Sequence, residues 1–158
     1  MNQVYYLQLH GKLSLNHSNP FAKISLRWVN DVEQHKWYIG LNGYPFAYIY
    51  GCRVHLHRFI HWLNVRYWTD LIVDHIDRDK FNATDSNLRE ATAKQNSYNK
   101  THTNPNHNIK YNESTGKFTV SIQKDKIVHK IDNIETINDA KNVYKLMAEE
   151  LFGEFVPI

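Results

Sequence analysis

The most constraining feature of this 158-residue chain is a pattern near its end, where an alternating segment precedes a helical stripe. In 117–122, apolar side chains occupy every second position, which is typical of a strand with one buried face. Further on, apolar residues recur at helical spacing, at Ala140, Val143, Tyr144, Met147, Ala148 and Leu151. This pattern predicts a helix that lies across a small sheet.

Two further strands are expected in the same region, at Ile109–Asn112 and at 126–131. Thr136 suits the N-cap of the helix, and Gly153 is placed to end it. The sequence therefore predicts a C-terminal domain over 108–158, in which a three-stranded antiparallel sheet packs on one helix. The preceding residues, 101–107, lie in a stretch rich in Asn, Thr and His and are expected to form a linker.

The first 70 residues are expected to form a β-rich module within a first domain that spans 1–100. The strand candidates are Val4–Leu9, Ile24–Trp28 and Lys36–Ile39. The aromatic residues that would share one face of an extended segment are Tyr44, Phe46, Tyr48 and Tyr50. We interpret them as part of a small sheet core, with stacking on nucleic-acid bases as the alternative. Helical spacing begins at Val54 and continues to Leu63.

Composition excludes several classes of site and protein. Cys52 is the only cysteine, which excludes an internal disulfide and zinc sites that need two or more cysteines. No window approaches 18 uninterrupted apolar residues and the start lacks a signal pattern, so we expect neither a membrane association nor secretion. The net charge of +3 is unevenly spread, because residues 1–70 hold seven Lys/Arg against three Asp/Glu. Local basic patches of this kind permit nucleic-acid binding.

The residues best suited to chemistry gather in a central stretch. The apolar run 71–73 predicts a strand that ends on Asp74 and His75. Asn87 follows His75 by twelve residues, and Asn96 follows Asn87 by nine, in a segment without Gly or Pro that could be helical. Phosphodiester hydrolysis needs an activated water and a cation that stabilises developing charge. A histidine with a pKa near neutrality is a suitable general base for that water.

This His, Asn, Asn series resembles the HNH endonucleases, especially the homing endonucleases of phages and introns. The resemblance implies a ββα-metal unit over about 71–100, within an overall α+β fold. It implies that His75 is the general base and that Asn87 holds His75 in position. It further implies that Asp74 and Asn96 bind one divalent ion, Mg²⁺ or Mn²⁺, whose shell is completed by water and substrate oxygens.

Several assignments stay open around this motif. The alternatives to the two predicted metal ligands are Asn99, Asp77 and Asp79. Arg89 is expected either to contact a DNA phosphate or to form a surface ion pair. His57 and His61 are four residues apart, a spacing that can bind a metal, although ordinary histidines without a metal are the favoured interpretation. The segment 57–60 is also similar to a His-Arg-Leu-Val helix that precedes the motif in many HNH proteins.

The tail, roughly 107–158, resembles the ethylene-response-factor type of DNA-binding domain. The matching residues are Thr115-Gly116-Lys117-Phe118, Ala140, Tyr144 and the ending Glu150-Leu151-Phe152-Gly153-Glu154-Phe155. In that family the sheet enters the major groove of DNA and the helix backs the sheet. The resemblance implies that five outward residues face DNA, namely Lys110, Lys117, Thr119, Ser121 and Lys130. The alternative is that these are ordinary solvated sheet positions.

Together these features predict a divalent-metal-dependent endonuclease of the HNH type that acts on double-stranded DNA. We expect a monomer, with a dimer as the route to double-strand cleavage, in the cytoplasm of a bacterial host if the chain is phage-encoded. One alternative is a catalytically inactive protein that binds DNA through the C-terminal sheet. A second is an assembly protein whose aromatic N-terminal sheet binds another protein.

Overall fold

A computed structural model of the chain describes residues 3–99, 104 and 106–156. The chain divides into two compact units, Met1–Lys94 and Gln95–Ile158. Helices and several small sheets occur in it, which confirms the predicted α+β class. Of the predicted linker, residues 101–103 and 105 lie outside the described residues, and the predicted domain boundaries stay predictions.

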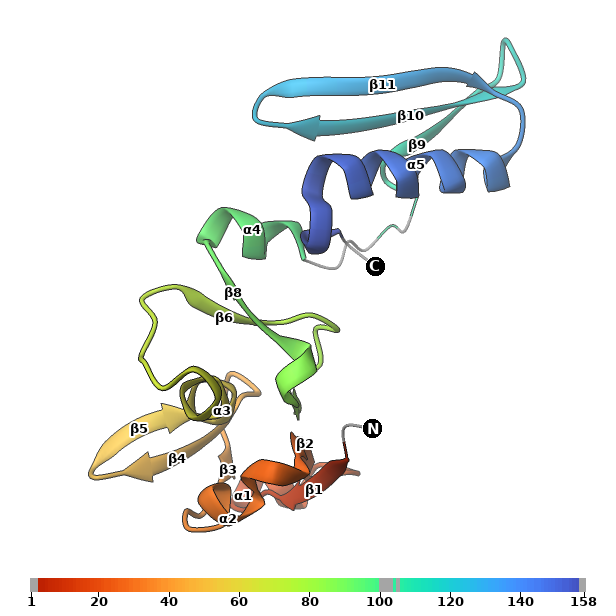
Figure 1. The fold of residues 1–158 in the computed structure, drawn as a ribbon. Helices are drawn as coiled ribbons and strands as arrows, with labels where there is room; N and C mark the ends of the chain where they lie inside the picture. Colours follow the sequence, from red (N-terminus) through yellow and green to blue (C-terminus); the bar gives the residue numbers. More distant parts are fainter. Residues whose placement is uncertain (1–2, 100–103, 105, 157–158) are drawn as a thin grey trace. The chain divides into compact units, whose positions relative to one another are not determined.

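Three small sheets build the first unit (Figure 1). One sheet has the order β1-β2-β7, with strands at Val4–Gln8, Phe21–Ser25 and Asn82–Ala83. Another has the order β3-β4-β5, with strands at Tyr38–Ile39, Pro45–Ile49 and Cys52–His55. The third is a hairpin of β6 (Ile72–His75) and β8 (Leu88–Ala91). The helical elements are α1 (Lys12–Leu15), η1 (Leu26–Trp28), α2 (Val29–Val32), α3 (Leu56–Val65) and η2 (Asp85–Asn87). Helix α4 (Ala93–Tyr98) follows β8, so the order strand, strand, helix expected over 71–100 is present.

One hydrophobic core holds these elements together. Its largest fully buried side chains include Trp37, Leu9, Ile24, Leu56 and Ile60. The indole N–H of Trp37 donates to the carbonyl of Val32 at 2.8 Å, which satisfies a polar group that would otherwise be costly to bury. Helix α3 contributes Leu56 and Ile60, so the helix before the central motif is anchored in the N-terminal core.

The loop between β6 and β8 binds the N-terminal sheet through strand pairing and hydrogen bonds. Strand β7 pairs in parallel with β2 and sets Ala83 opposite Ile24. Two residues further on, Asp85 accepts hydrogen bonds from the indole N–H of Trp28 at 2.7 Å and from Nε of Arg27 at 2.8 Å. The predicted β-rich module and the two strands of the predicted nuclease motif therefore share one compact unit.

Several expected elements have different bounds, and two of these differences have a clear structural reason. The strand expected over 24–28 ends at Ser25, because the chain leaves the sheet as η1. The helix expected from Val54 begins at Leu56, because Val54 pairs with Ala47 in the β4–β5 hairpin.

The interpretation of the alternating aromatics as a sheet core is wrong. The buried residues of β4 are Pro45 and Ala47, whereas Tyr48 is 64% exposed. Tyr50 is fully exposed in the turn after β4. Successive side chains of a strand point to opposite faces, so a shift of one position decides which set is buried.

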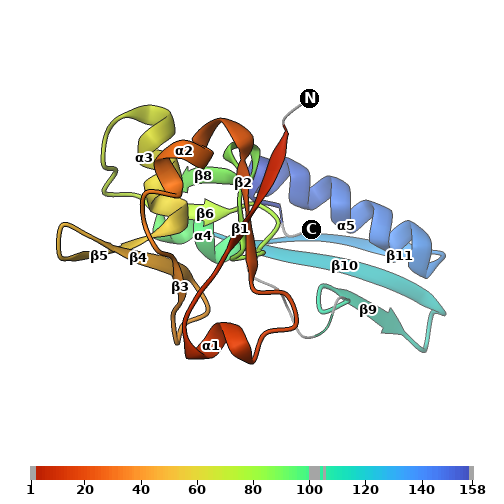
Figure 2. The same cartoon turned by 90° about the horizontal axis from the view of Figure 1, so that it is seen from below.

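The second unit has the predicted three-stranded antiparallel sheet and one helix. Its strands are β9 (Ile109–Asn112), β10 (Lys117–Lys124) and β11 (Ile127–Ile134), in the order β11-β10-β9. Helix α5 (Ile137–Phe152) runs along one face of this sheet, as Figures 1 and 2 show. A short 3-10 turn, η3 (Gly153–Phe155), ends the described chain. A bulge lies in β11, where Asn133 has a φ of 64° and the register shifts between the pairs Phe118–Ile134 and Val120–Ile131.

Both predicted ends of α5 are confirmed. The hydroxyl of Thr136 accepts a hydrogen bond from the backbone N–H of Asp139 at 3.1 Å. Gly153 occupies the C-cap with a φ of 57°. The apolar stripe packs as expected, with Ala140 and Ala148 fully buried. No helix in the described part of the chain has the length and apolar character needed to cross a membrane.

Candidate active site and candidate nucleic-acid face

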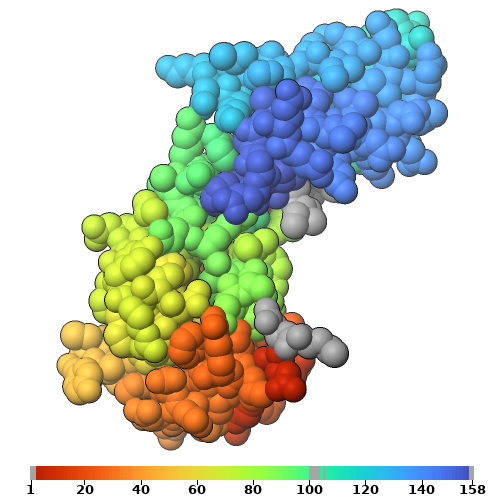
Figure 3. All heavy atoms as spheres, in the orientation of Figure 1, coloured from red at the N-terminus to blue at the C-terminus, as the bar shows by residue number. Residues whose placement is uncertain are grey.

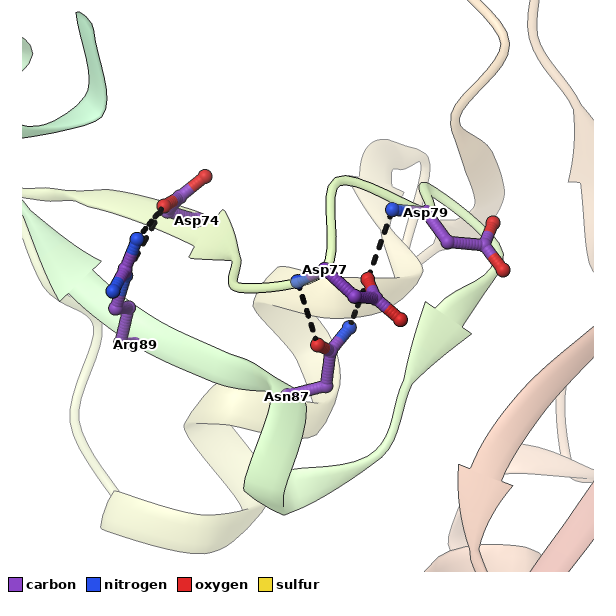
Figure 4. A network of polar contacts seen from close by, with 5 residues as sticks. All are labelled: Asp74, Asp77, Asp79, Asn87 and Arg89. Carbon is purple, nitrogen blue, oxygen red and sulfur yellow. Dashed lines mark hydrogen bonds and ion pairs between the residues drawn. The ribbon is translucent and has the colours of Figure 1, made fainter. Parts of the chain in front are cut away.

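The β6–β8 hairpin sets Asp74 and His75 at the end of a buried strand. Its antiparallel register places Asp74 opposite Arg89 and His75 opposite Leu88. Asp74 is 8% exposed and His75 is 4% exposed. Arg89 donates to Oδ2 of Asp74 from Nε at 3.2 Å and from Nη2 at 3.1 Å (Figure 4). Of the two expectations for Arg89, an ion pair is therefore present, but it is buried in the hairpin rather than on the surface.

The side-chain amide of Asn87 clamps the turn that follows His75. Its Oδ1 accepts a hydrogen bond from the backbone N–H of Asp77 at 3.0 Å. Its Nδ2 donates to Oδ1 of Asp77 at 2.8 Å and to the carbonyl of Asn82 at 2.7 Å. The backbone carbonyl of Asn87 also accepts from the N–H of Ile76 at 2.9 Å. The chain directly after His75 is thus fixed by both the side chain and the backbone of one buried asparagine.

Asp77 and Asp79 organise this turn. Asp77 Oδ1 accepts from the backbone N–H of Asp79 at 2.9 Å, and its Oδ2 accepts from Nδ2 of Asn82 at 2.7 Å. Asp79 Oδ1 in turn accepts from the N–H of Phe81 at 2.9 Å. Burial raises the pKa of Asp77, but the hydrogen bonds to its carboxylate outweigh this effect and hold the pKa below its usual value. Both oxygens of Asp77 are therefore committed to turn contacts.

Aromatic and histidine rings surround His75. The ring of His57, from α3, lies 4.8 Å from that of His75 between centroids, and Tyr44 lies 6.0 Å from it. His57 also stacks on His55 at 5.6 Å. Burial lowers the pKa of His75, and the carboxylates of Asp77, Asp74 and Asp79 only partly oppose this effect. A neutral imidazole at pH 7 is the form that can accept a proton.

Tyr44 and His57 stood out in the sequence for other reasons, but nothing in the pattern placed them, or His55, in this shell around His75. The only available signal was the similarity of the segment 57–60 to the helix that precedes HNH motifs. The neighbouring Arg58 was missed as well; its guanidinium donates to the carbonyls of Thr69 at 2.6 Å and Leu71 at 3.1 Å. These bonds fix the chain that leads into β6.

His57 and His61 do not form a metal pair in this arrangement. His57 faces His75, whereas His61 lies 3.5 Å from a carboxylate oxygen of Glu90. Within residues 3–99, 104 and 106–156, no group of three or more His, Cys, Asp or Glu side chains is placed to hold a metal ion. The interpretation of the His57 and His61 spacing as ordinary histidines stays a prediction.

The candidate amide ligands lie beyond the first unit. Asn96 is in α4, and Asn99 follows that helix and is 4% exposed. Both belong to the second unit, so their roles as metal ligands stay predictions. Asp74 and an asparagine amide offer oxygen donors, the kind that Mg²⁺ and Mn²⁺ prefer, so the donor set fits such an ion.

The five residues predicted to face DNA share the side of the C-terminal sheet that is turned away from α5. The helix packs on the side that holds Phe118 and Val120. The register pairs Lys110 with Thr119 and Ser121 with Lys130 on the other side. A shallow hollow of about 570 Å³ on this side is lined in part by Lys110, Thr119 and Lys130.

Carboxylates lie among these outward residues. Asp132 accepts a hydrogen bond from the Thr119 hydroxyl at 2.7 Å and pairs with Lys130 at 2.9 Å. Lys117 pairs with Glu135 at 2.7 Å. The cations of this surface were predicted from the sequence, but the two carboxylates that pair with them were not. Asp132 is two residues from Lys130 on β11, whereas its bond to Thr119 crosses to β10, and Glu135 is 18 residues from Lys117.

Comparison with known proteins gives one informative match. The chain is 43% identical over 157 residues to a curated protein of Acanthamoeba polyphaga mimivirus that is named an uncharacterized HNH endonuclease. The alignment covers 98% of this chain and 81% of that relative. No protein-family model matches the chain, and no solved structure matches it.

Proposed function

Because the chain belongs to the HNH endonuclease family, we propose that it hydrolyses phosphodiester bonds of DNA with the help of a divalent metal ion. One observation carries this proposal. Asp74 and His75 are adjacent and buried at the end of β6, and the amide of Asn87 fixes the turn behind them.

His75 acts as the general base. Its neutral imidazole removes a proton from the attacking water, whose oxygen then bonds to phosphorus while the bond to the departing oxygen breaks. Burial of the ring supports this role, because it lowers the pKa and keeps the base free of a proton at neutral pH. Asn87 supports the base by holding the turn after it, and we expect it not to touch DNA.

Asp74 and Asn96 would hold the ion, Mg²⁺ or Mn²⁺, with water and phosphate oxygens as further ligands. When bound, the ion stabilises the negative charge that develops on the phosphate and on the departing oxygen. Asp74 is favoured over Asp77, since both oxygens of Asp77 already accept hydrogen bonds in the turn. Arg89 orients Asp74 through its two bonds to Oδ2, so it positions a ligand rather than contacting DNA.

The second unit would bind double-stranded DNA through the outward face of its sheet. Lys110, Lys117 and Lys130 supply the charge, and Thr119 and Ser121 supply hydroxyl groups for phosphate or base contacts. A nuclease motif joined to a separate DNA-binding domain suits a homing endonuclease, because linked weak contacts add to one useful affinity. One motif in each chain makes a monomer a nickase, and a dimer would cut both strands.

The test is incubation of a supercoiled plasmid library carrying random inserts with the purified chain and Mg²⁺. Wild type is compared with His75→Ala and with the matched control His17→Ala, whose histidine is exposed and lies outside the motif. We expect nicked or linear DNA from wild type and His17→Ala only, and none after chelation. Equal cutting by His75→Ala would refute the assigned base. Absence of cutting by every variant, with DNA still bound, would favour an inactive DNA-binding protein.

A further inference from the structure

A second concave site lies in the first unit, away from His75. It is a hollow of about 360 Å³ between the tip of the β4–β5 hairpin and the end of α3. Its aromatic lining consists of Tyr50, Phe59, Trp62 and Trp68. Phe59 and Trp62 are three residues apart and share one face of α3, whereas His57 lies on another face, beside His75. The hairpin projects from the surface beside this site (Figures 1 and 3).

Three rings of this groove form a stack that runs from the buried Phe59 through the half-buried Trp62 to the exposed Trp68. Phe59 and Trp62 are 5.9 Å apart with an interplanar angle of 22°, and Trp62 and Trp68 are 5.7 Å apart with an angle of 16°. Trp68 ends this series and is 54% exposed. A half-exposed tryptophan at the end of a parallel stack presents a flat apolar face to solvent, which is the surface on which another planar ring binds.

Two residues at the rim adopt backbone conformations that folding alone does not favour for them. Tyr50 has a φ of 49° and shares the two-residue turn of the β4–β5 hairpin with Gly51, a position where Asn is usually preferred. Arg66 has a φ of 64° at the C-cap of α3, where Gly is preferred. Large side chains are thus retained at two left-handed positions beside one hollow, as is common at binding sites.

The polar groups at this site suit a nucleotide. The guanidinium of Arg66 lies 5.7 Å from the ring centres of both Trp28 and Trp62, and no described carboxylate lies within ion-pair distance of it. Asp31 and Gln34 also line the hollow. A carboxylate and an amide can bind the polar edge of a base, while an arginine without an acidic partner can bind its phosphate.

We propose that this groove binds an unpaired base of the DNA substrate, which stacks on Trp68 while Arg66 contacts the adjoining phosphate. The inference rests on the proposed function in taking DNA as the substrate. Paired bases do not fit, because their faces are covered by neighbouring bases in the duplex. An apolar protein side chain would use the rings but would leave the cation of Arg66 without an anionic partner, so the nucleotide, which offers both a ring and a phosphate, is the better match.

The number of residues between Trp68 and His75 limits the distance between the unpaired base and the cleaved bond. Trp68 precedes His75 by seven residues, and Arg58 fixes the segment between them. Seven residues span at most about 25 Å. At about 3.4 Å for each nucleotide of one strand, the unpaired base lies within roughly seven nucleotides of the cleaved bond.

The experiment measures binding without metal, in a chelating buffer, by fluorescence anisotropy of a labelled ten-nucleotide thymidine oligomer and of a duplex of equal length. The variants are Trp68→Ala, Arg66→Gln and the control Tyr48→Ala, whose exposed ring is on the same hairpin but does not line the hollow. We expect Trp68→Ala to weaken single-strand binding roughly 5- to 150-fold. Arg66→Gln should lower the slope of log affinity against log salt by about 0.7. Tyr48→Ala should match wild type.

Equal single-strand affinity for wild type and Trp68→Ala would overturn the proposal, and so would an equal loss of duplex and single-strand binding. Thermal unfolding checks that each variant folds, and Trp68→Phe, which keeps a ring, should retain most of the affinity. A cleavage assay separates this result from the nuclease proposal. The assay uses substrates with a mismatch near the cut. His75→Ala should lose cutting and keep single-strand binding, whereas Trp68→Ala should keep cutting and lose single-strand binding. These two results together would support two distinct sites.

Discussion

Asn87 and Asp77 exchange two hydrogen bonds: the N–H of Asp77 donates to Oδ1 of Asn87 at 3.0 Å, and Nδ2 of Asn87 donates to Oδ1 of Asp77 at 2.8 Å. With the further bond to the carbonyl of Asn82, one buried amide satisfies three groups of the turn after His75. The conformation of that turn therefore depends on this amide.

Replacement of Asn87 should therefore cost stability and activity together. Asn87→Ala removes three hydrogen bonds of a half-buried turn and should lower the free energy of unfolding by about 2–4 kcal/mol. Asn87→Asp should be no better, because a second carboxylate would face Asp77 at hydrogen-bond distance. Urea unfolding and plasmid nicking measure the two effects. Unchanged stability in Asn87→Ala would show that the three hydrogen bonds of the Asn87 amide do not stabilise the turn.

His57 should make the protein sensitive to acid. Burial, aided by the neighbouring His75, His55, Arg58 and His61, lowers the pKa of His57 to about 2 from 6.5. Below pH 6.5 the unfolded chain binds a proton at this histidine and the folded chain does not, so stability must fall as pH decreases. The loss should begin near pH 6.5 and continue toward lower pH. Above pH 6.5 this residue should contribute no slope.

Urea midpoints measured at pH 7.5 and pH 5 test this expectation. Wild type should lose stability between the two values, and His57→Gln should lose less. Part of the loss should persist in the variant, because burial also lowers the pKa of His75 and His55. Identical pH slopes for wild type and His57→Gln would show that His57 is protonated in the folded state or accessible to water.

The parts of this molecule that follow from the sequence are those set by local pattern. The alternation through Phe118 and Val120, and the cap at Thr136, placed the C-terminal sheet and helix correctly. The strand that ends on Asp74 and His75 was equally evident, because a short apolar run before two polar residues is a local signal.

Contacts between distant segments could not be obtained in this way. Strand β7 has two residues, and its parallel pairing with β2 depends on the shared core rather than on any periodicity. The rings of His57 and Tyr44 reach His75 through the packing of α3 and the loop before β4. Burial of Pro45 and Ala47 instead of the neighbouring aromatics was likewise a tertiary choice between two faces of one strand.

The link between the N-terminal strands and the central loop should be measurable at Asp85. This carboxylate accepts from the indole of Trp28 and from Arg27, and its backbone N–H donates to the hydroxyl of Ser25 at 3.0 Å. Asp85→Ala should lower the free energy of unfolding by about 1–3 kcal/mol, because the indole N–H loses its acceptor. Arg27→Ala is the matched control and should cost about 1 kcal/mol or less, since its side chain is largely exposed. Equal losses would mean that the indole bond adds little.

Carboxylates on the outward face of the C-terminal sheet should lower its affinity for DNA. Asp132 lies 2.9 Å from Lys130 and binds Thr119, so it competes with phosphate for both groups. Asp132→Asn should raise duplex affinity at low salt, because it removes a negative charge and releases Lys130.

Lys130→Ala should weaken binding to all sequences and reduce the salt slope by about 1. Lys141→Ala, on the exposed side of α5, should leave both quantities unchanged. Anisotropy titrations of one duplex over 50–200 mM salt compare all three variants. If Lys141→Ala and Lys130→Ala behaved alike, this side of the sheet would not be the face that binds DNA.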